Sequence, residues 1–84
     1  MKKRPAIMIY MDILTLLRDG PVGPTRLARA CNLSYDRLGN YLAPLLAKGL
    51  VIEGTEEGHE FYGITPEGLQ LLRDMEGVMR RLLP

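Results

Sequence analysis

The sequence predicts a small α+β domain that is mostly helical, with three helices, a β-hairpin and a fourth helix in that order. Three observations predict it. Apolar residues recur at helical spacing in three long stretches of the chain. Ser34 and Thr65 each stand directly before such a stretch, where helix N-caps belong. Two short runs separated by glycine-containing sequence indicate a hairpin within residues 50–64.

The first predicted helix covers residues 6–18, because apolar side chains at positions 9, 13, 16 and 17 form one face of it. Asp19-Gly20-Pro21 ends that helix, since glycine suits the position after a helix and proline cannot continue one. A short second helix is predicted at residues 26–31, with Thr25 as its N-cap.

The third predicted helix runs from Tyr35 to about Lys48, with Ser34 as its N-cap. Leu38, Leu42 and Leu45 line its inner face. Pro44 lies inside this helix, where it removes one hydrogen bond and crowds the preceding turn at a cost of ~3 kcal/mol. We therefore predict a kink, or a break and restart, near residues 40–44.

The hairpin is predicted as strands at residues 50–53 and 60–64, joined by a loop at residues 55–59. The fourth helix, residues 66–83, begins with Pro66 after the N-cap Thr65. Its apolar stripe is longer than one small core can cover, so its later part is predicted to meet a second copy of the chain. The predicted dimer interface consists of Leu72, Met75, Val78, Met79 and Leu82.

The order of these elements is that of a winged helix-turn-helix domain, in which the third helix enters the major groove of DNA and the hairpin is the wing. Arginine pairs with guanine and asparagine with adenine on their major-groove edges, so Arg37 and Asn40 are predicted base readers. The other predicted DNA contacts are polar or basic residues near the phosphates. They are Ser34, Tyr35, Arg26, Arg29, Lys2, Lys3 and Arg4.

Several short stretches also resemble the archaeal-type winged helix-turn-helix family of DNA-binding transcription regulators. The stretches are Asn32-Leu33-Ser34-Tyr35, Tyr41-Leu42, Lys48-Gly49-Leu50, and Tyr62 with Thr65 and Gly68. This resemblance covers roughly residues 10–75. It implies a DNA-binding winged helix and a dimer, because some members dimerise through a C-terminal helix.

Charge is divided unevenly along the 84 residues. Residues 1–49 carry eight Lys or Arg against three Asp, a balance of +5, whereas residues 50–84 carry three Arg against seven acids, a balance of −4. The basic half, with a basic arm at residues 1–5, favours double-stranded DNA as the partner. Glu56 and Glu57 at the wing tip would be repelled by phosphate, so we expect the wing to point away from DNA or to serve packing. The alternative is a protein–protein interaction module that uses the acidic wing and the C-terminal helix.

The sequence contains none of the patterns that we associate with catalysis or a cofactor. Cys31 is predicted to be a core thiol, and His59 lies in a loop without the ligand spacing of a zinc site. We therefore expect a non-enzyme with no cofactor and no metal. A single domain over residues 1–84, without a membrane span, is expected to be cytoplasmic and associated with the nucleoid.

Overall fold

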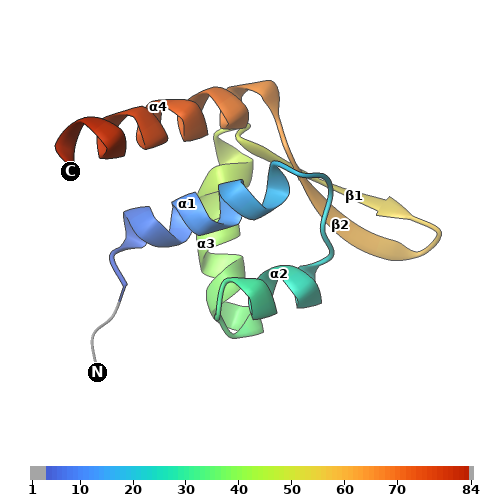
Figure 1. The fold of residues 1–84 in the computed structure, drawn as a ribbon. Coiled ribbons are helices and arrows are strands. Elements are labelled where there is room, and N and C mark those ends of the chain that lie inside the picture. The colour runs from blue at the N-terminus through green and yellow to red at the C-terminus, as the bar shows by residue number, and fades with distance from the viewer. Residues whose placement is uncertain (1–3, 84) are drawn as a thin grey trace.

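The computed structural model describes residues 4–83 (Figure 1). It confirms the predicted fold class: four helices and one two-stranded antiparallel hairpin form a winged helix. Figure 1 shows α1 in the middle of the molecule, α4 lying across it, and the hairpin extending to one side. The elements are α1 (Ala6–Leu17), α2 (Pro24–Ala30), α3 (Tyr35–Ala47), β1 (Val51–Glu56), β2 (His59–Ile64) and α4 (Pro66–Leu82).

The core is built around α1, because this helix is packed against α2, α4 and β2. Ile9, Ile13, Leu14 and Leu17 of α1 are almost completely buried. The remaining core side chains are aliphatic or small and come from each of the other helices, from β1 and from the connecting segments. They include Leu27, Cys31, Leu38, Leu42, Leu45, Val51 and Leu72. Burial of these apolar side chains is what holds the short helices in place, since helices of this length are marginal in isolation.

Two predicted N-caps are confirmed. The Ser34 hydroxyl oxygen accepts a hydrogen bond from the backbone N–H of Arg37 at 3.2 Å. The Thr65 hydroxyl oxygen accepts from the N–H of Gly68 at 3.0 Å and donates to the carbonyl of Gly49 at 2.7 Å. Thr65 thereby ties the beginning of α4 to the segment that follows α3.

The predicted N-cap of the second helix is wrong. α2 begins at Pro24, one residue before Thr25, and Gly23 is its N-cap. Proline suits the first helical position because its fixed φ is already helical and its missing N–H would have no partner there. Thr25 is therefore an exposed residue inside the helix rather than its cap.

The predicted break and restart near Pro44 is also wrong, because α3 is one helix from Tyr35 to Ala47, whereas the predicted kink stays a prediction. Leu38 and Leu42 before the proline and Leu45 after it are all buried in the same core. Burial of leucine side chains, at about 1.5–3 kcal/mol each, offsets the cost of a proline in the helix interior. The helix continues past the proline, as shown by the 3.1 Å hydrogen bond from the N–H of Lys48 to the Pro44 carbonyl.

The wing is longer and its turn tighter than predicted. β1 and β2 pair from Val51–Ile64 to Glu56–His59, which leaves only Glu57 and Gly58 in the turn. Both turn residues have positive φ, 52° and 80°, as a two-residue type I′ turn requires. Reciprocal backbone hydrogen bonds of 3.0 and 2.8 Å join Val22 to Tyr62 and attach the chain before α2 to the free edge of β2.

Candidate nucleic-acid interface

The first half of α3 presents an uninterrupted exposed surface. Ser34, Tyr35, Arg37 and Asn40, which were predicted to contact DNA, are all exposed there. Asn40 lies on the outward line of the helix, directly opposite the buried leucines. The other residues of that line are Asp36, Ala43 and Ala47, at intervals of three and four. Their side chains are short, so the helix surface has low relief along the part that would face a groove.

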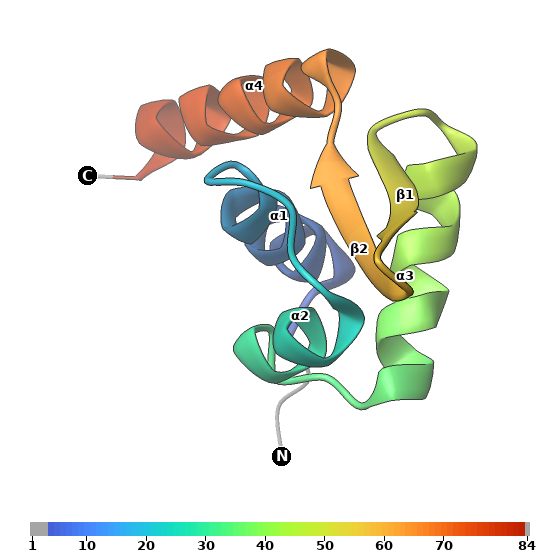
Figure 2. The same cartoon turned by 90° about the vertical axis from the view of Figure 1, so that its right-hand side faces the viewer.

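α2, the helix of the two predicted arginines, lies at the same end of the molecule as the start of α3 (Figure 2). Arg26 and Arg29 are both exposed and three residues apart, so they share one side of the helix. The α2–α3 turn is fixed by a 2.9 Å hydrogen bond from the N–H of Leu33 to the carbonyl of Ala28. The turn therefore fixes how α2 is set against α3.

The arm residue Arg4 has partners inside the protein. Its guanidinium forms a 2.6 Å ion pair with Asp12 and donates a hydrogen bond to the carbonyl of Cys31. These contacts join the beginning of α1 to the end of α2. Lys2 and Lys3, the other two predicted contacts of the arm, lie outside the described residues.

Replacing Arg4 by alanine is expected to lower stability rather than to remove a phosphate contact. The change removes the Asp12 pair and leaves the Cys31 carbonyl without its donor, a loss of about 1–3 kcal/mol. Urea denaturation followed by circular dichroism measures this loss. Fluorescence anisotropy measures how the logarithm of the DNA-binding constant falls with the logarithm of the salt concentration, and we expect this slope to be the same in the variant. A slope smaller by about one would show that Arg4 contacts a phosphate.

The wing carries its acidic residues on both faces and at its tip. Side chains alternate across a strand, so Glu53, Glu60 and Tyr62 share the face that also carries the buried Val51. The pKa of Tyr62 is raised by burial and then by the nearby carboxylates of Glu53 and Glu60, with a smaller contribution from Tyr35. The wing therefore carries negative charge on the same face as Val51 and Tyr62.

The same acidic face reaches toward α2. Arg26 and Glu60 line one shallow hollow together with Gly23 and His59. The carbonyl of Glu60 lies 3.5 Å from where a Cβ on Gly23 would be, so the backbones of the two segments run close together. The negative charge of Glu60 reduces the attraction of Arg26 for an anion, whereas Arg29 lies one turn farther along α2.

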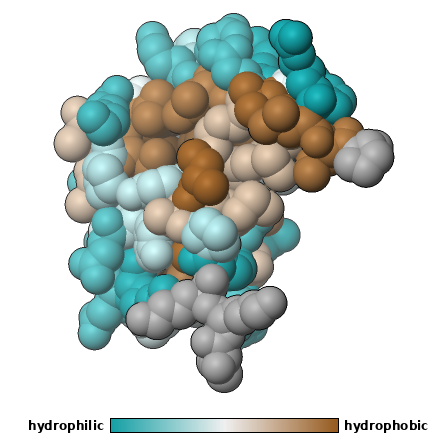
Figure 3. Space-filling model, turned by 90° about the vertical axis from the view of Figure 1, so that its left-hand side faces the viewer, coloured by the Kyte–Doolittle hydropathy of each residue, from teal (hydrophilic) through white to brown (hydrophobic). Residues whose placement is uncertain are grey.

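A second exposed surface is apolar and runs along α4 onto α1 (Figure 3). Val78 and Leu82 of the predicted dimer interface are 54% and 76% exposed, and Met75 and Met79 are half-buried. Leu72 is 1% exposed within the protomer, so its place in the predicted interface is wrong. Its side chain points into the core at the crossing of α4 with α1, where a second copy has no access to it.

Three further residues belong to this surface. Leu71 lies on the same outward stripe as Met75, Val78 and Leu82, at intervals of four, three and four. Ile7 of α1 is 56% exposed beside it, and Met11 lines the same apolar groove. The spacing of Leu71 was visible in the sequence, but the contribution of α1 depends on how the helices cross.

The described residues offer little for catalysis or metal binding. Residues 4–83 contain no group of three His, Cys, Asp or Glu side chains placed to hold a metal ion. Burial raises the pKa of the Cys31 thiol, which keeps it protonated and unreactive in the core. None of the helices within residues 4–83 is long and apolar enough to cross a membrane.

The geometry of a helix-turn-helix followed by a hairpin agrees with a match of residues 3–82 to the winged helix-turn-helix family. The chain belongs to this family. The family resemblance found in the sequence is thus confirmed.

Three relatives of the chain come from archaea. An uncharacterized protein of Methanocaldococcus jannaschii is 30% identical over 82 residues, which is 98% of this chain and 37% of the relative. The transcriptional regulator BldR of Sulfolobus solfataricus is similar in structure, with a TM-score of 0.83 and 26% identity over 89% of this chain and 56% of BldR. The DNA-binding protein Sso10a-2 of the same organism has a TM-score of 0.77 and 26% identity over 94% of this chain and 85% of its own. The chain thus spans little more than a third of the curated relative that it matches.

Proposed function

We propose that the protein is a homodimeric DNA-binding transcription regulator, without catalytic activity, that places α3 in the major groove. The observation that carries the proposal is the exposed first half of α3, which presents Arg37 and Asn40 on a surface of low relief. The names of its structural relatives, a transcriptional regulator and a DNA-binding protein, support it. Association with the nucleoid follows from the same proposal.

The side chains of α3 suit base reading better than phosphate binding. Asn40 can form two hydrogen bonds with adenine, and Arg37 can do the same with guanine. Asp36 beside them would be repelled by phosphate but can accept a hydrogen bond from cytosine. The short side chains of Ala43 and Ala47 let the helix backbone approach the floor of the groove.

Phosphate contacts are expected mainly on the α2 side of α3. Arg29 is exposed there and lies farther than Arg26 from the acidic Glu60. Glu53 and Glu60 of the wing would repel a nearby DNA backbone by ~1 kcal/mol per charge at close range in water. We therefore expect the duplex to lie against α2 and α3, and we expect the wing to make no phosphate contacts.

A homodimer through the apolar surface of α4 and α1 completes the proposal. Two copies related by a two-fold axis would bury the exposed Val78 and Leu82, and the same surface would serve both. Two α3 helices would then enter successive major grooves, ~34 Å apart.

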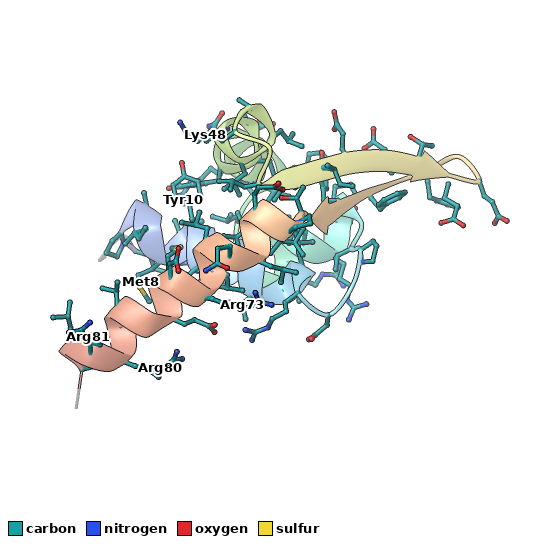
Figure 4. All side chains as sticks on the ribbon, turned by 90° about the horizontal axis from the view of Figure 1, so that it is seen from above. Met8, Tyr10, Lys48, Arg73, Arg80 and Arg81 are labelled. Carbon is teal, nitrogen blue, oxygen red and sulfur yellow. The ribbon has the colours of Figure 1, made fainter. Side chains whose placement is uncertain are left out.

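Replacing Arg37 by alanine tests whether α3 recognises bases in DNA. The variant should bind duplex DNA about 1–3 kcal/mol more weakly and lose preference at one base pair, because a base contact is removed. Fluorescence anisotropy with random and selected duplexes at several salt concentrations measures both effects. Arg73→Ala is the matched control, since it removes the same charge from the exposed side of α4, away from the surface in question (Figure 4).

Two outcomes would contradict the proposed base reading. If Arg37→Ala and Arg73→Ala weaken DNA binding equally, the weakening comes from the loss of one positive charge anywhere on the protein. In that case α3 does not read the base sequence. If the unmodified protein binds no duplex even at low salt, the protein–protein module becomes the better interpretation, with the acidic wing as its contact surface.

A further inference from the structure

Asp36 lies on the outward line of α3, one turn before Asn40. Both side chains are exposed and stand opposite the buried Leu38 and Leu42. Arg37, the next residue, is turned by about 100° from Asp36 around the helix axis. An α3 helix seated in a groove would therefore direct the Asp36 carboxylate at the base edges as squarely as the Asn40 amide.

This carboxylate has no partner among the described residues. Neither the ion pairs nor the side-chain hydrogen bonds found within residues 4–83 include Asp36. An acidic residue in the first turn does stabilise a helix through the helix dipole, and Glu67 stands at the corresponding position of α4. Helix stability thus accounts equally for Asp36 and Glu67, so a DNA-binding measurement is needed to separate the two residues.

The surface around Asp36 attracts phosphate only weakly. Residues 24–40, which hold α2 and the first half of α3, carry three Arg and one Asp, a balance of +2. The wing, residues 51–64, carries four Glu and no Lys or Arg, a balance of −4. Non-specific binding to DNA comes almost entirely from phosphates that basic side chains neutralise. These elements therefore gain little affinity from the DNA backbone and depend on contacts with bases.

A carboxylate in the major groove distinguishes bases because it can only accept hydrogen bonds. Cytosine presents an amino donor on its major-groove edge, whereas thymine presents a carbonyl acceptor and a methyl group. Opposite a base without a donor, the carboxylate loses water and gains no partner, which is unfavourable for a charged group. Asp36 would therefore favour cytosine and disfavour thymine at the same position.

We propose that Asp36 is a specificity-determining residue of α3, which selects cytosine at one position of the binding site and weakens binding to sequences without it. Arg37 and Asn40 supply attractive contacts with bases, and Asp36 supplies the unfavourable contact that rejects other sequences. The protein is then a sequence-specific binder of duplex DNA rather than one that coats DNA of any sequence. This inference rests on the proposed function and names the DNA that the same surface selects.

Replacing Asp36 by asparagine tests this role with little change of shape, because the asparagine amide can both donate and accept hydrogen bonds. A preferred duplex is first selected from a random pool with the unmodified protein. Each of its cytosines is then replaced by thymine in turn, together with the pairing base. At one position the unmodified protein should bind the thymine duplex about 5- to 100-fold more weakly than the selected duplex.

Asp36→Asn should bind those two duplexes equally. It should also bind random-sequence duplex about 2- to 5-fold more tightly than the unmodified protein, because one negative charge near the phosphates is removed. Fluorescence anisotropy at 0.1 M salt measures both effects.

Glu67→Gln is the matched control. Glu67 is exposed and, like Asp36, is the second residue after its N-cap, so both substitutions remove one negative charge from the first turn of a helix. α4 begins beside the end of α3, because Thr65 bonds to the carbonyl of Gly49, and the 13 residues of α3 are about 20 Å long. The starts of α3 and α4 therefore lie at opposite ends of the molecule (Figure 2). Charges more than ~10 Å apart are largely screened at 0.1 M salt, so Glu67→Gln should change neither measurement.

Two outcomes would overturn the role of Asp36 and leave the proposed function in place, since Arg37→Ala tests that function separately. The first is an equal gain in affinity for random duplex from Asp36→Asn and Glu67→Gln, because the carboxylate would then act through net charge alone. The second is that no thymine weakens binding, or that the weakening persists in Asp36→Asn, because Asp36 would then not read that base. If the unmodified protein binds no duplex even at low salt, the proposed function and the role of Asp36 both fail.

Discussion

Replacing Gly68 by alanine is expected to lower the free energy of unfolding by about 3 kcal/mol, at the upper end of the range for overpacked sites. A Cβ built on Gly68 would lie 2.1 Å from the carbonyl oxygen of Leu50 and 2.8 Å from Cγ1 of Ile64. The first of these is a backbone atom, in the same carbonyl that accepts the N–H of Thr65 at 3.1 Å. It cannot move without breaking the junction that holds α4 against the wing.

The matched control is the same substitution at Gly77 in the same helix. Nothing lies within 4 Å of a Cβ on Gly77, so alanine there gains helix propensity and should stabilise the protein by about 0.5–1 kcal/mol. Urea denaturation of both variants at one protein concentration, followed by circular dichroism, measures the two changes. Opposite signs are expected; equal effects would mean that α4 does not approach Leu50 as closely as the structure describes.

Replacing Val78 by aspartate is expected to convert the proposed dimer to a monomer and to weaken binding to a two-half-site duplex on the order of 100-fold. Val78 lies in the middle of the apolar surface, where the two-fold axis would place a second copy of itself nearby. Two buried carboxylates without partners make that contact unfavourable. Analytical ultracentrifugation reports the mass, and fluorescence anisotropy with one- and two-half-site duplexes reports the loss of bivalent binding.

Ile52→Asp is the control for this experiment. Ile52 is 54% exposed, the same fraction as Val78, but it lies on the wing rather than on α4. It should leave both the mass and the ratio of affinities for the two duplexes unchanged. If Ile52→Asp rather than Val78→Asp produces a monomer, the dimer forms through the wing and the α4 surface needs another explanation.

Much of the secondary structure could be predicted from residues that are close together in the sequence. Ser34 and Thr65 determine where α3 and α4 begin, because the hydroxyl of each satisfies an N–H of the helix's first turn. The exposure of Arg37 and Asn40 follows from the spacing of the leucines opposite them. These features depend on residues three or four apart, which a sequence displays directly.

The errors arose where distant segments meet. Pro44 was expected to interrupt α3, but burial of the leucines on either side of it outweighs the local cost. Arg4 was predicted from its charge alone, and its contacts with Asp12 and the Cys31 carbonyl could not be seen in the sequence. The wing was judged by the acidic pair at its tip, whereas the hollow that Glu60 shares with Arg26 depends on the fold.

The sequence by itself determined the order of the elements, their caps and the outward residues of α3, because backbone hydrogen bonding and helical periodicity act over a few residues. Only the tertiary structure decided which part of the α4 stripe is free and which is core. Leu72 and Leu71 are neighbours in the chain and equally apolar. The crossing of α1 over α4 buries the first and leaves the second beside Ile7 at the edge of an open groove.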